Sequence, residues 1–339
     1  MIDWEPILDA TVAVLAARAA VLLAALAIDW LVGEPDILWR RVPHPVVLFG
    51  RAISFMDKRL NRRRGVTGKS RQARGILAIV ILVVLAAMVG WGLSFGGPVV
   101  ACIILAVLLA ARSLDEHIRA VATAMGEGIG AARTAVGMIV GRETKSMKKG
   151  DIARAAIETG AENLSDGVIA PALWFLAGGL PGLLAYKMVN TADSMIGYRN
   201  AKYRAFGCGA ARIDDAMNLI PARLTALLIC GAATLNGRGS AALGTMMRDG
   251  RHHASPNAGW PEAAMAGAIN VWLAGPRRYG NRIRQARRFN EGGSEADAGA
   301  IRHSLRLLIM AQLLFALLIL PAVPVSYTHL RAHETNSNR

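Results

Sequence analysis

The sequence has few cysteines and few charged residues for its length. Its three cysteines, Cys102, Cys208 and Cys230, are scattered through 339 residues and have no metal-ligand spacing. An odd, dispersed set favours neither a disulfide framework nor a zinc site. Charged residues make up 19% of the chain, whereas about 25% is usual for a soluble domain. Because hydrophobic residues reach 53% and the mean hydropathy is +0.35, we expect an integral membrane protein.

Several signatures of enzymes and of nucleic-acid-binding proteins are missing as well. The chain lacks a Gly-x-x-x-x-Gly-Lys-Ser/Thr loop, which excludes a P-loop nucleotide site. It also lacks a zinc-protease helix, a serine-hydrolase elbow and a Cys–His nucleophile pattern. The net charge of +15 would suggest nucleic acid in a soluble protein. However, the basic run at 58–74 has no interleaved aromatic residue and lies between apolar segments, as cytoplasmic loops do. We therefore predict that residues 33–74 face the cytoplasm and that no nucleic acid is bound.

Long apolar segments predict membrane-spanning helices. Roughly 20 apolar residues cross a bilayer as one helix, and four segments approach this length, near 12–32, 75–94, 98–112 and 305–323. The middle two are joined at Gly96-Gly97-Pro98, which cannot easily continue a helix, so we expect a helical hairpin. No stretch shows sustained period-two alternation, and only helices or closed barrels span membranes. The predicted fold class is therefore an all-α, polytopic helical membrane protein.

The region between these spans, residues 113–304, is expected to carry the catalytic loops. Residues 113–160 have helical periodicity with apolar and charged faces, typical of amphipathic helices on a membrane or on a bundle. Shorter apolar stretches follow, and the one at 168–186 contains the sequence Gly-Gly-Leu-Pro-Gly at 178–182. That sequence indicates either a re-entrant hairpin or a break between two crossings.

The last residues differ from the rest of the chain. Residues 326–339, SYTHLRAHETNSNR, are polar and without periodicity. We predict one membrane-embedded domain, 1–325, followed by a non-native tail.

Acidic residues spaced by four form the first polar cluster. Glu158, Glu162 and Asp166 would share one helical face at this spacing. Three carboxylates on one face repel each other unless a cation lies among them, and hard oxygen ligands suit Mg²⁺. A solvated helix face is the alternative interpretation.

A second cluster combines a carboxylate, an amide and two cations within a short segment. It contains Lys187, Asn190, Asp193 and Arg199. Cations for oxyanions and a carboxylate for a metal are what a nucleotide or phosphorylated substrate needs. Interfacial snorkelling would explain the lysine and the arginine, but not the amide and carboxylate on the same segment.

Two further clusters lie beside apolar segments. In the first, Asp214 and Asp215 lie four and three residues before Asn218 and share a helical face with it, close to Arg212. In the second, prolines and a glycine predict a rigid loop at 253–262 that presents Asn257 and Glu262.

The remaining candidates lie in other loops. His44 stands between two prolines and is either a site residue or a loop anchor. Arg142 belongs to a further charged turn, at 141–144.

At these clusters the sequence resembles the adenosylcobinamide-phosphate synthase family, the membrane synthetases of cobalamin biosynthesis. The resemblance rests on ETGAENLSDGVIAPALWFLAGGLPGLLAYKMVNTADSMIGYRN, RIDDAMNLIPARLTALL and SPNAGWPEAAMAGAINV. Gly33-Glu34-Pro35 and His44-Pro45-Val46 are similar to the family's opening segment. The likeness runs from about residue 25 to 323. One departure is Glu143, where the family pattern leads us to expect Asp; the carboxylate is kept.

The resemblance implies an ATP-dependent amide ligase with Mg²⁺. Such an enzyme would join adenosylcobyric acid, through its remaining propionate carboxylate, to aminopropanol phosphate or a related amino-alcohol phosphate. It would lie in the bacterial cytoplasmic (inner) membrane among lipids, with its active-site loops facing the cytoplasm. Other enzymes of the corrinoid pathway are expected partners.

The same resemblance suggests roles for the clustered residues. The expected catalytic residues are Glu162, Asp166, Asp193, Asp215 and Glu262. The expected metal ligands are Glu158, Glu162, Asp166 and Asp214. The expected substrate- and nucleotide-binding residues are His44, Arg142, Lys187, Asn190, Arg199, Arg212, Asn218 and Asn257.

Two other functions remain open at this point. A membrane prenyltransferase also holds Mg²⁺-diphosphate with Asp and Asn at helix ends, and Asp214-Asp215-x-x-Asn218 fits that pattern. It would need a second Asp-rich motif, and the Ser-Pro-Asn loop has no place in it. A transporter would explain broken apolar segments, but the polar clusters lie at segment ends and no internal repeat is visible.

Overall fold

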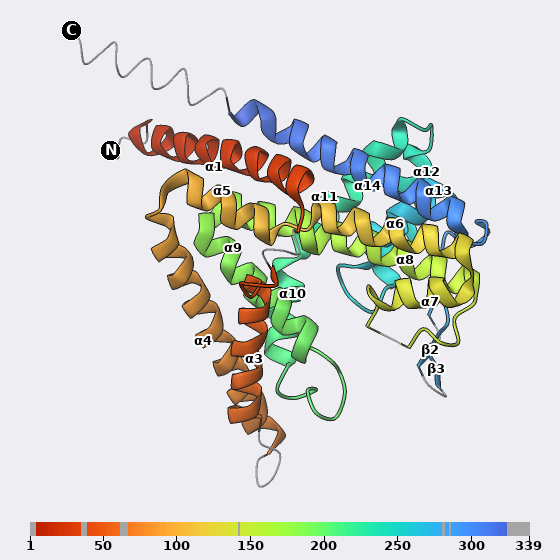
Figure 1. The fold of residues 1–339 in the computed structure, drawn as a ribbon, viewed down its shortest axis with the longest axis horizontal. Helices are drawn as coiled ribbons and strands as arrows, with labels where there is room; N and C mark the ends of the chain where they lie inside the picture. The colour runs from red at the N-terminus through yellow and green to blue at the C-terminus, as the bar shows by residue number, and fades with distance from the viewer. Residues whose placement is uncertain are drawn as a thin grey trace. The chain divides into compact units, whose positions relative to one another are not determined.

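The computed structural model describes residues 5–34, 39–61, 67–141, 143–279, 282–284 and 286–323 (Figure 1). Arg142 and the predicted tail at 326–339 lie outside these ranges. The described chain is mainly helical and contains four strands of two or three residues, which confirms the all-α prediction. Its packing forms two compact units. Unit 1 comprises 1–109, 171–217 and 316–339, and unit 2 comprises 110–170 and 218–315. The single domain at 1–325 stays a prediction.

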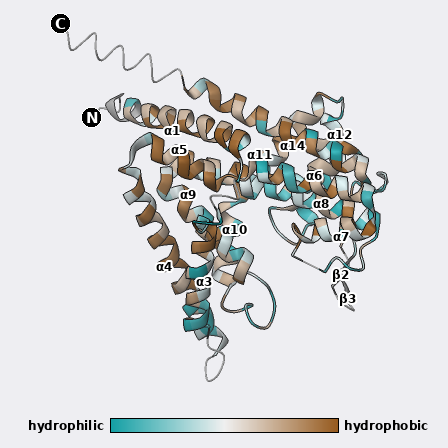
Figure 2. Ribbon diagram, viewed as in Figure 1, coloured by the Kyte–Doolittle hydropathy of each residue, from teal (hydrophilic) through white to brown (hydrophobic). Residues whose placement is uncertain are grey.

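Five helical stretches in the described chain are long and apolar enough to cross a membrane. They are Asp9–Val32, Gly68–Ser94, Gly97–Glu127, Lys149–Ile196 and Ala298–Ala322. These include all four predicted spans, and Figure 2 shows α1, α4 and α5 as largely hydrophobic. The additional stretch, Lys149–Ile196, contains the apolar segment 168–186, for which the sequence left a re-entrant hairpin and two crossings open. The protein is therefore a polytopic helical membrane protein.

Unit 1 is built around an apolar hairpin. Its elements are α1 (Glu5–Val32), α3 (Pro45–Leu60), α4 (Gly68–Ser94), α5 (Gly97–Leu108), nearly all of α9 (Ala170–Ile196), α10 (Cys208–Met217) and η3 (Leu320–Ala322). The chain reverses between α4 and α5, where Gly97 has a φ of 74°, so the predicted hairpin is confirmed. α1 packs on α5, and α3 and α10 both pack on α4.

Unit 2 is a bundle of shorter helices. It contains α6 (Ala111–Glu127), α7 (Ile129–Gly137), α8 (Lys149–Leu164), the π-helical turn η1 (Ser165–Ile169), α11 (Leu219–Thr234), α12 (Gly239–Asp249), the 3₁₀ turn η2 (Gly250–His252), α13 (Gly259–Ile269) and most of α14 (Ala298–Ile319). α11, α12 and α13 pack on one another, and α8 packs on α6, α7 and α13. α6 buries Leu114, Ile118, Val121 and Met125, which confirms the amphipathic prediction for this part of 113–160.

The strands of unit 2 form two small antiparallel pairs. β1 (Leu273–Ala274) pairs with β4 (Arg288–Phe289), and β2 (Arg277–Tyr279) pairs with β3 (Arg282–Arg284). The β1–β4 pair closes the long connection that follows α13, since the side chains of Leu273 and Phe289 are both buried.

The break predicted at 178–182 is confirmed, and it falls at Gly179. This residue has φ 62° and ψ −150°, far from helical values, and Pro181 follows two residues later. α9 is thus two helical halves joined at a glycine. Gly90 of α4 lies against the joint, because a Cβ on it would come within 2.6 Å of the Leu180 carbonyl oxygen.

Arg18 of α1 stabilises this break. Its Nη1 donates hydrogen bonds to the carbonyl oxygens of Leu176, at 2.9 Å, and of Ala177, at 2.8 Å. Both carbonyls lie in the last turn before Gly179, and the residue four positions after Ala177 is Pro181, which has no N–H to donate. An unsatisfied carbonyl in hydrocarbon costs several kcal/mol, and an arginine in an apolar span is itself costly. The contact therefore offsets both costs at once.

We expect Arg18→Leu to lower the free energy of unfolding by about 2 to 4 kcal/mol, because two carbonyls lose a charged donor. Chemical unfolding in detergent would measure this. Arg18→Lys should fall between the leucine variant and the wild type, since an ammonium can still donate. Val14→Ala, at an exposed position of the same helix, should change stability by less than about 0.5 kcal/mol. An unfolding midpoint for Arg18→Leu equal to that of the wild type would contradict the capping role.

Candidate functional site

In unit 1 the second half of α9 and the helix α10 bring polar residues together. Lys187, Asn190 and Asp193 are spaced by three along α9 and therefore lie on neighbouring positions of one face. The Asn190 side-chain amide donates to Asp214 Oδ1 on α10 at 3.5 Å. Trp174 Nε1 also donates to the Met217 carbonyl, at 3.2 Å, and ties the end of α10 to α9. The second and third sequence clusters thus meet in space, as a shared site requires.

Two carboxylates of this cluster are close enough to repel each other. Asp193 follows Asn190 on the same face of α9 and Asp215 follows Asp214 on α10, so the hydrogen bond between Asn190 and Asp214 joins the two helices that carry these carboxylates. Both carboxylates are partly buried. A pair of like charges in a partly desolvated place is stabilised by a cation between them. The arrangement can therefore hold one divalent ion or share one proton.

Burial distinguishes the basic residues of unit 1. Lys187 is only 8% exposed, so its ammonium does not snorkel to the surface, which was the alternative interpretation. A buried ammonium must be paired or hydrogen-bonded, and Lys187 therefore belongs to the interior of the polar cluster. Arg199 and Arg212 are exposed and keep their guanidinium groups at the surface.

Glycines fix the loop that follows α9. A Cβ on Gly197 would collide with the Asp193 carboxylate and come within 2.6 Å of the Asp193 carbonyl oxygen. A Cβ on Gly207 would collide with the Ile196 carbonyl, so the loop from 197 to 207 closes tightly on the end of α9. The close contact at Gly197 restricts where the Asp193 side chain can point. The glycine in the motif Asp-Ser-Met-Ile-Gly thus has a defined structural role.

An ion pair holds the far side of the same loop. Lys202 Nζ lies 2.9 Å from Asp57 Oδ2 of α3, and the Tyr203 hydroxyl donates to the same oxygen at 3.1 Å. Burial alone would raise the pKa of Asp57, but hydrogen bonds from Lys202, Asn61 and Tyr203 together hold the pKa below its usual value. Asp57 is therefore ionised at neutral pH and committed to Lys202.

In unit 2 the predicted three-carboxylate face is not formed. Glu158 is 6% exposed, and its Oε1 accepts the backbone N–H of Ala274 at 2.7 Å, whereas Glu162 is exposed. The helix changes to a π turn at Ser165–Ile169, which alters the angular spacing on which the prediction relied. Among the residues that the structure describes, no group of three or more His, Cys, Asp or Glu side chains could hold a metal ion. Glu158, Glu162 and Asp166 belong to unit 2 and Asp214 to unit 1, and their joint role as metal ligands stays a prediction.

The π turn itself marks Asp166 as a candidate. π turns inside helices are rare and occur often at functional sites. The turn packs against α11, and the Gly167 carbonyl accepts the N–H of Ala110 at 3.2 Å. Asn218, one residue before α11, is 1% exposed. The turn is a structural feature that helical periodicity could not reveal.

The loop before α13 is rigid, as predicted, and an arginine fixes it. Arg223 of α11 donates to Asn257 Oδ1 at 2.9 Å and to the Pro256 carbonyl at 3.2 Å, and its guanidinium lies 4.8 Å from the centre of the Trp260 ring. Ser255 Oγ accepts the backbone N–H groups of Asn257 and Ala258. Asn257 is thereby held by specific partners and is 5% exposed.

Sequence reasoning missed two neighbours of the predicted residues. Arg223 contacts Asn257 across 34 positions of the chain, and His253 Nε2 lies 3.9 Å from Glu262 Oε1. Glu262 is 2% exposed, so the histidine is placed beside a buried carboxylate. Arg223 lies inside the quoted segment RIDDAMNLIPARLTALL and His253 lies two residues before SPNAGWPEAAMAGAINV, but the pairing of each depends on the fold.

His44 acts as an anchor in this structure. Its Nδ1 accepts the N–H of Val46 at 3.3 Å, and its Nε2 lies 3.2 Å from the Val107 carbonyl oxygen, to which it donates. The ring also packs edge-on against Trp39, with centroids 4.5 Å apart. With both ring nitrogens engaged, the loop-anchor alternative is favoured over a binding role.

Comparison with known proteins assigns the chain to a family. The sequence model described as CobD/Cbib protein matches residues 22–308. A cobalamin biosynthesis protein CobD from Brucella anthropi is 48% identical over 301 residues, which is 86% of this chain and 92% of that protein. Proteins of the same name from Sinorhizobium sp. and Rhodobacter capsulatus are 51% and 43% identical, over 77% and 78% of this chain and 84% of each relative. No solved structure matches significantly.

These matches span nearly the whole described chain, including both units and every quoted motif. They confirm the resemblance seen in the sequence, and the chain belongs to the CobD/CbiB family, that of adenosylcobinamide-phosphate synthase.

Proposed function

We propose that this protein is a membrane-bound ligase of cobalamin biosynthesis. It joins the free propionate carboxylate of adenosylcobyric acid to the amine of aminopropanol phosphate, or of a related amino-alcohol phosphate, at the expense of ATP. The product is adenosylcobinamide phosphate. The observation that carries the proposal is family membership over residues 22–308 with relatives named for cobalamin biosynthesis. The polar cluster of α9 and α10 supplies the matching chemistry.

Amide formation from a carboxylate needs activation. A carboxylate is a poor acyl donor, so a nucleotide must first convert it to an acyl phosphate or an equivalent. That step depends on positioning and on charge stabilisation rather than on covalent catalysis by the protein. The amine then attacks the activated carbonyl, the bond from that carbon to the phosphate oxygen breaks so that phosphate leaves, and the nitrogen loses a proton. A carboxylate of the Asp193–Asp215 pair is suited to accept that proton, because both side chains are partly buried and lie on the two helices that the Asn190–Asp214 hydrogen bond joins.

The same pair fits a divalent cation. Mg²⁺ takes oxygen ligands and is commonly held by one or two carboxylates plus substrate phosphates. Asp193 and Asp215 provide two carboxylates, and their mutual repulsion is what a bound cation would relieve. When bound, Mg²⁺ would supply charge neutralisation for the phosphates. Asn190 and Asp214, linked by a hydrogen bond, orient the surrounding polar groups.

The distribution of basic residues along the chain indicates which loops face the cytoplasm. The protein would lie in the bacterial inner membrane with the basic segment 58–74 in the cytoplasm. The loop 197–207 is joined to α3 by Lys202 and Asp57. The polar end of α9 would therefore face the cytoplasm too, where ATP is available. The two other functions considered, prenyltransferase and transporter, receive no support from the relatives' names.

The first test is product formation by purified protein in detergent, truncated after Val325. With adenosylcobyric acid, Mg-ATP and aminopropanol phosphate, we expect the corrinoid to gain the mass of one amide-linked amino-alcohol phosphate. We also expect ATP hydrolysis in proportion to product formation. Mass spectrometry would measure the corrinoid product, and a phosphate-release assay would measure the hydrolysis. Omitting ATP is the control and should abolish the gain. Folded protein that binds corrinoid but yields no new mass with any amino-alcohol phosphate would refute the ligase.

The second test concerns the carboxylate pair. We expect Asp193→Asn and Asp215→Asn each to lower the ligation rate by roughly a hundredfold or more, since metal-assisted charge stabilisation is worth several kcal/mol. The Mg²⁺ concentration for half-maximal rate should rise as well. Asp9→Asn, which removes an exposed carboxylate from α1, is the matched control and should leave both unchanged. Normal ligation and normal Mg²⁺ dependence in Asp193→Asn would remove this residue from the site.

A further inference from the structure

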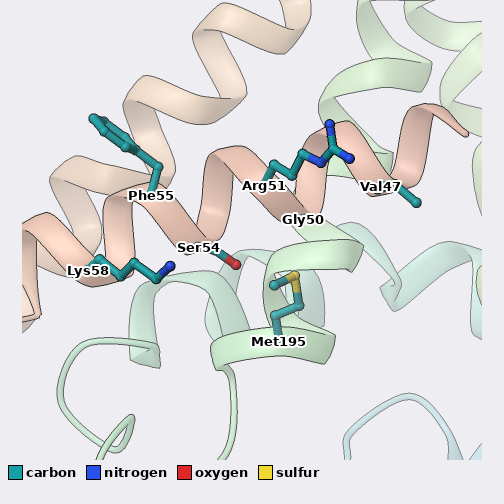
Figure 3. A pocket seen from close by; sticks show the side chains of 7 residues that line it. All are labelled: Val47, Gly50, Arg51, Ser54, Phe55, Lys58 and Met195. Atoms are coloured by element: carbon teal, nitrogen blue, oxygen red, sulfur yellow. The ribbon is translucent and has the colours of Figure 1, made fainter. Parts of the chain in front are cut away.

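A groove in unit 1 lies beside the polar cluster and includes none of its residues. It has a volume of about 480 Å³ and runs along one face of α3, opposite the last turn of α9 (Figure 3). Its lining residues are Val47, Gly50, Arg51, Ser54, Phe55, Lys58 and Met195. Gly50 lets the two helices approach, since a Cβ there would lie 3.4 Å from Met195 Sδ. The volume is in the range of ordinary small-molecule sites.

The groove carries two cations without an opposing carboxylate. Within the described chain, neither Arg51 nor Lys58 makes an ion pair. The nearby Asp57 cannot neutralise them, because it is engaged by Lys202 at 2.9 Å. Figure 3 shows the Lys58 ammonium and the Ser54 hydroxyl on the side of α3 that faces Met195. The lining therefore has two cationic side chains and one hydroxyl donor, with Lys58 and Ser54 on the Met195 side of α3 and Arg51 extending toward its other edge (Figure 3).

The spacing of the charges indicates the size of the anion. Arg51 and Lys58 are seven residues apart, which is two helical turns and about 10 Å along the axis. A chain of two or three phosphates offers oxygens along this length for both long, flexible side chains. The other wall belongs to α9, where Asp193 lies two residues before Met195. Carboxylates for a metal and cations for phosphates thus lie on facing elements of one unit.

We propose that this groove binds the polyphosphate chain of the Mg-nucleotide, with Arg51 and Lys58 on its oxygens and Ser54 donating a hydrogen bond. The proposal deepens the ligase function and rests on it. It adds three residues of α3 to the nucleotide site, none of them among the residues expected from the sequence. Phe55 and Val47 add apolar surface to the lining of the groove, and both side chains are about half exposed.

Calorimetric titration with Mg²⁺ and a non-hydrolysable ATP analogue tests the groove independently of turnover. In neutral detergent we expect Arg51→Gln and Lys58→Gln each to raise the Kd by about tenfold or more, because each loses a charged hydrogen bond. Ser54→Ala should have a smaller effect. Lys69→Gln removes an exposed cation of the same basic segment and should change the Kd by less than about twofold. Unchanged affinity in the Arg51→Gln/Lys58→Gln double variant overturns the proposal.

Two further arms separate other sources of phosphate. If the variants raise only the KM for the amino-alcohol phosphate, the groove holds that monoester and the polyphosphate assignment is wrong. If they keep nucleotide affinity but lose binding to phosphatidylglycerol vesicles relative to phosphatidylcholine vesicles, the groove holds a lipid headgroup, and the assignment is again wrong. If the wild type binds the nucleotide and this binding depends on Lys58, but no amide forms, the groove proposal is supported and the ligase proposal is refuted. If the wild type ligates fully and the variants keep the wild-type affinity for the nucleotide, the ligase proposal is supported and the groove proposal is refuted.

Discussion

The break in the helix α9 at Gly179 is the constraint on which the packing of unit 1 depends. A bilayer offers no water to satisfy carbonyl groups, so a helix that breaks within an apolar span needs donors from elsewhere in the protein. Arg18 provides them for Leu176 and Ala177, and Gly90 allows α4 to lie against the joint. Because both compensations come from separate helices, the break fixes the mutual positions of α1, α4 and α9. The second half of α9, with its polar face, then emerges in a defined direction toward α10.

The polar cluster at the end of α9 is held together at a cost in stability. Asp193 and Asp215 repel each other, and Lys187 is buried, so the local arrangement is less favourable than an apolar contact would be. It persists because surrounding contacts over-determine it: Trp174 binds the end of α10, and Gly197 and Gly207 close the loop. Such a cluster gains stability when a ligand of complementary charge binds, since ligand binding to the folded state alone stabilises it. Ligand binding thus offsets the free-energy cost of holding these charged groups together.

Sequence patterns predicted what depends on neighbouring residues and missed what depends on distant ones. The hairpin at 96–98 and the break at 178–182 follow from glycine and proline, whose backbone effects are local. The meeting of Asn190 with Asp214 was foreseeable because only a short loop joins α9 to α10. In contrast, Glu158 was predicted as a metal ligand on an acidic helix face, and its hydrogen bond from the N–H of Ala274, 116 residues away, could not be foreseen. The π turn at 165–169 and the contact of Arg223 with Asn257 likewise depend on tertiary packing.

A magnesium–nucleotide complex presents oxyanions and a divalent cation within a few ångströms of each other. A protein that binds it needs both cations and carboxylates close to the ligand. In unit 1 the two signs are carried by different helices, with Arg51 and Lys58 on α3 and Asp193 and Asp215 on α9 and α10. The carboxylate that could neutralise the α3 cations, Asp57, is engaged by Lys202 of the following loop. That ion pair thus has two effects: it closes the loop on the site, and it leaves the charges of the groove available for an anion.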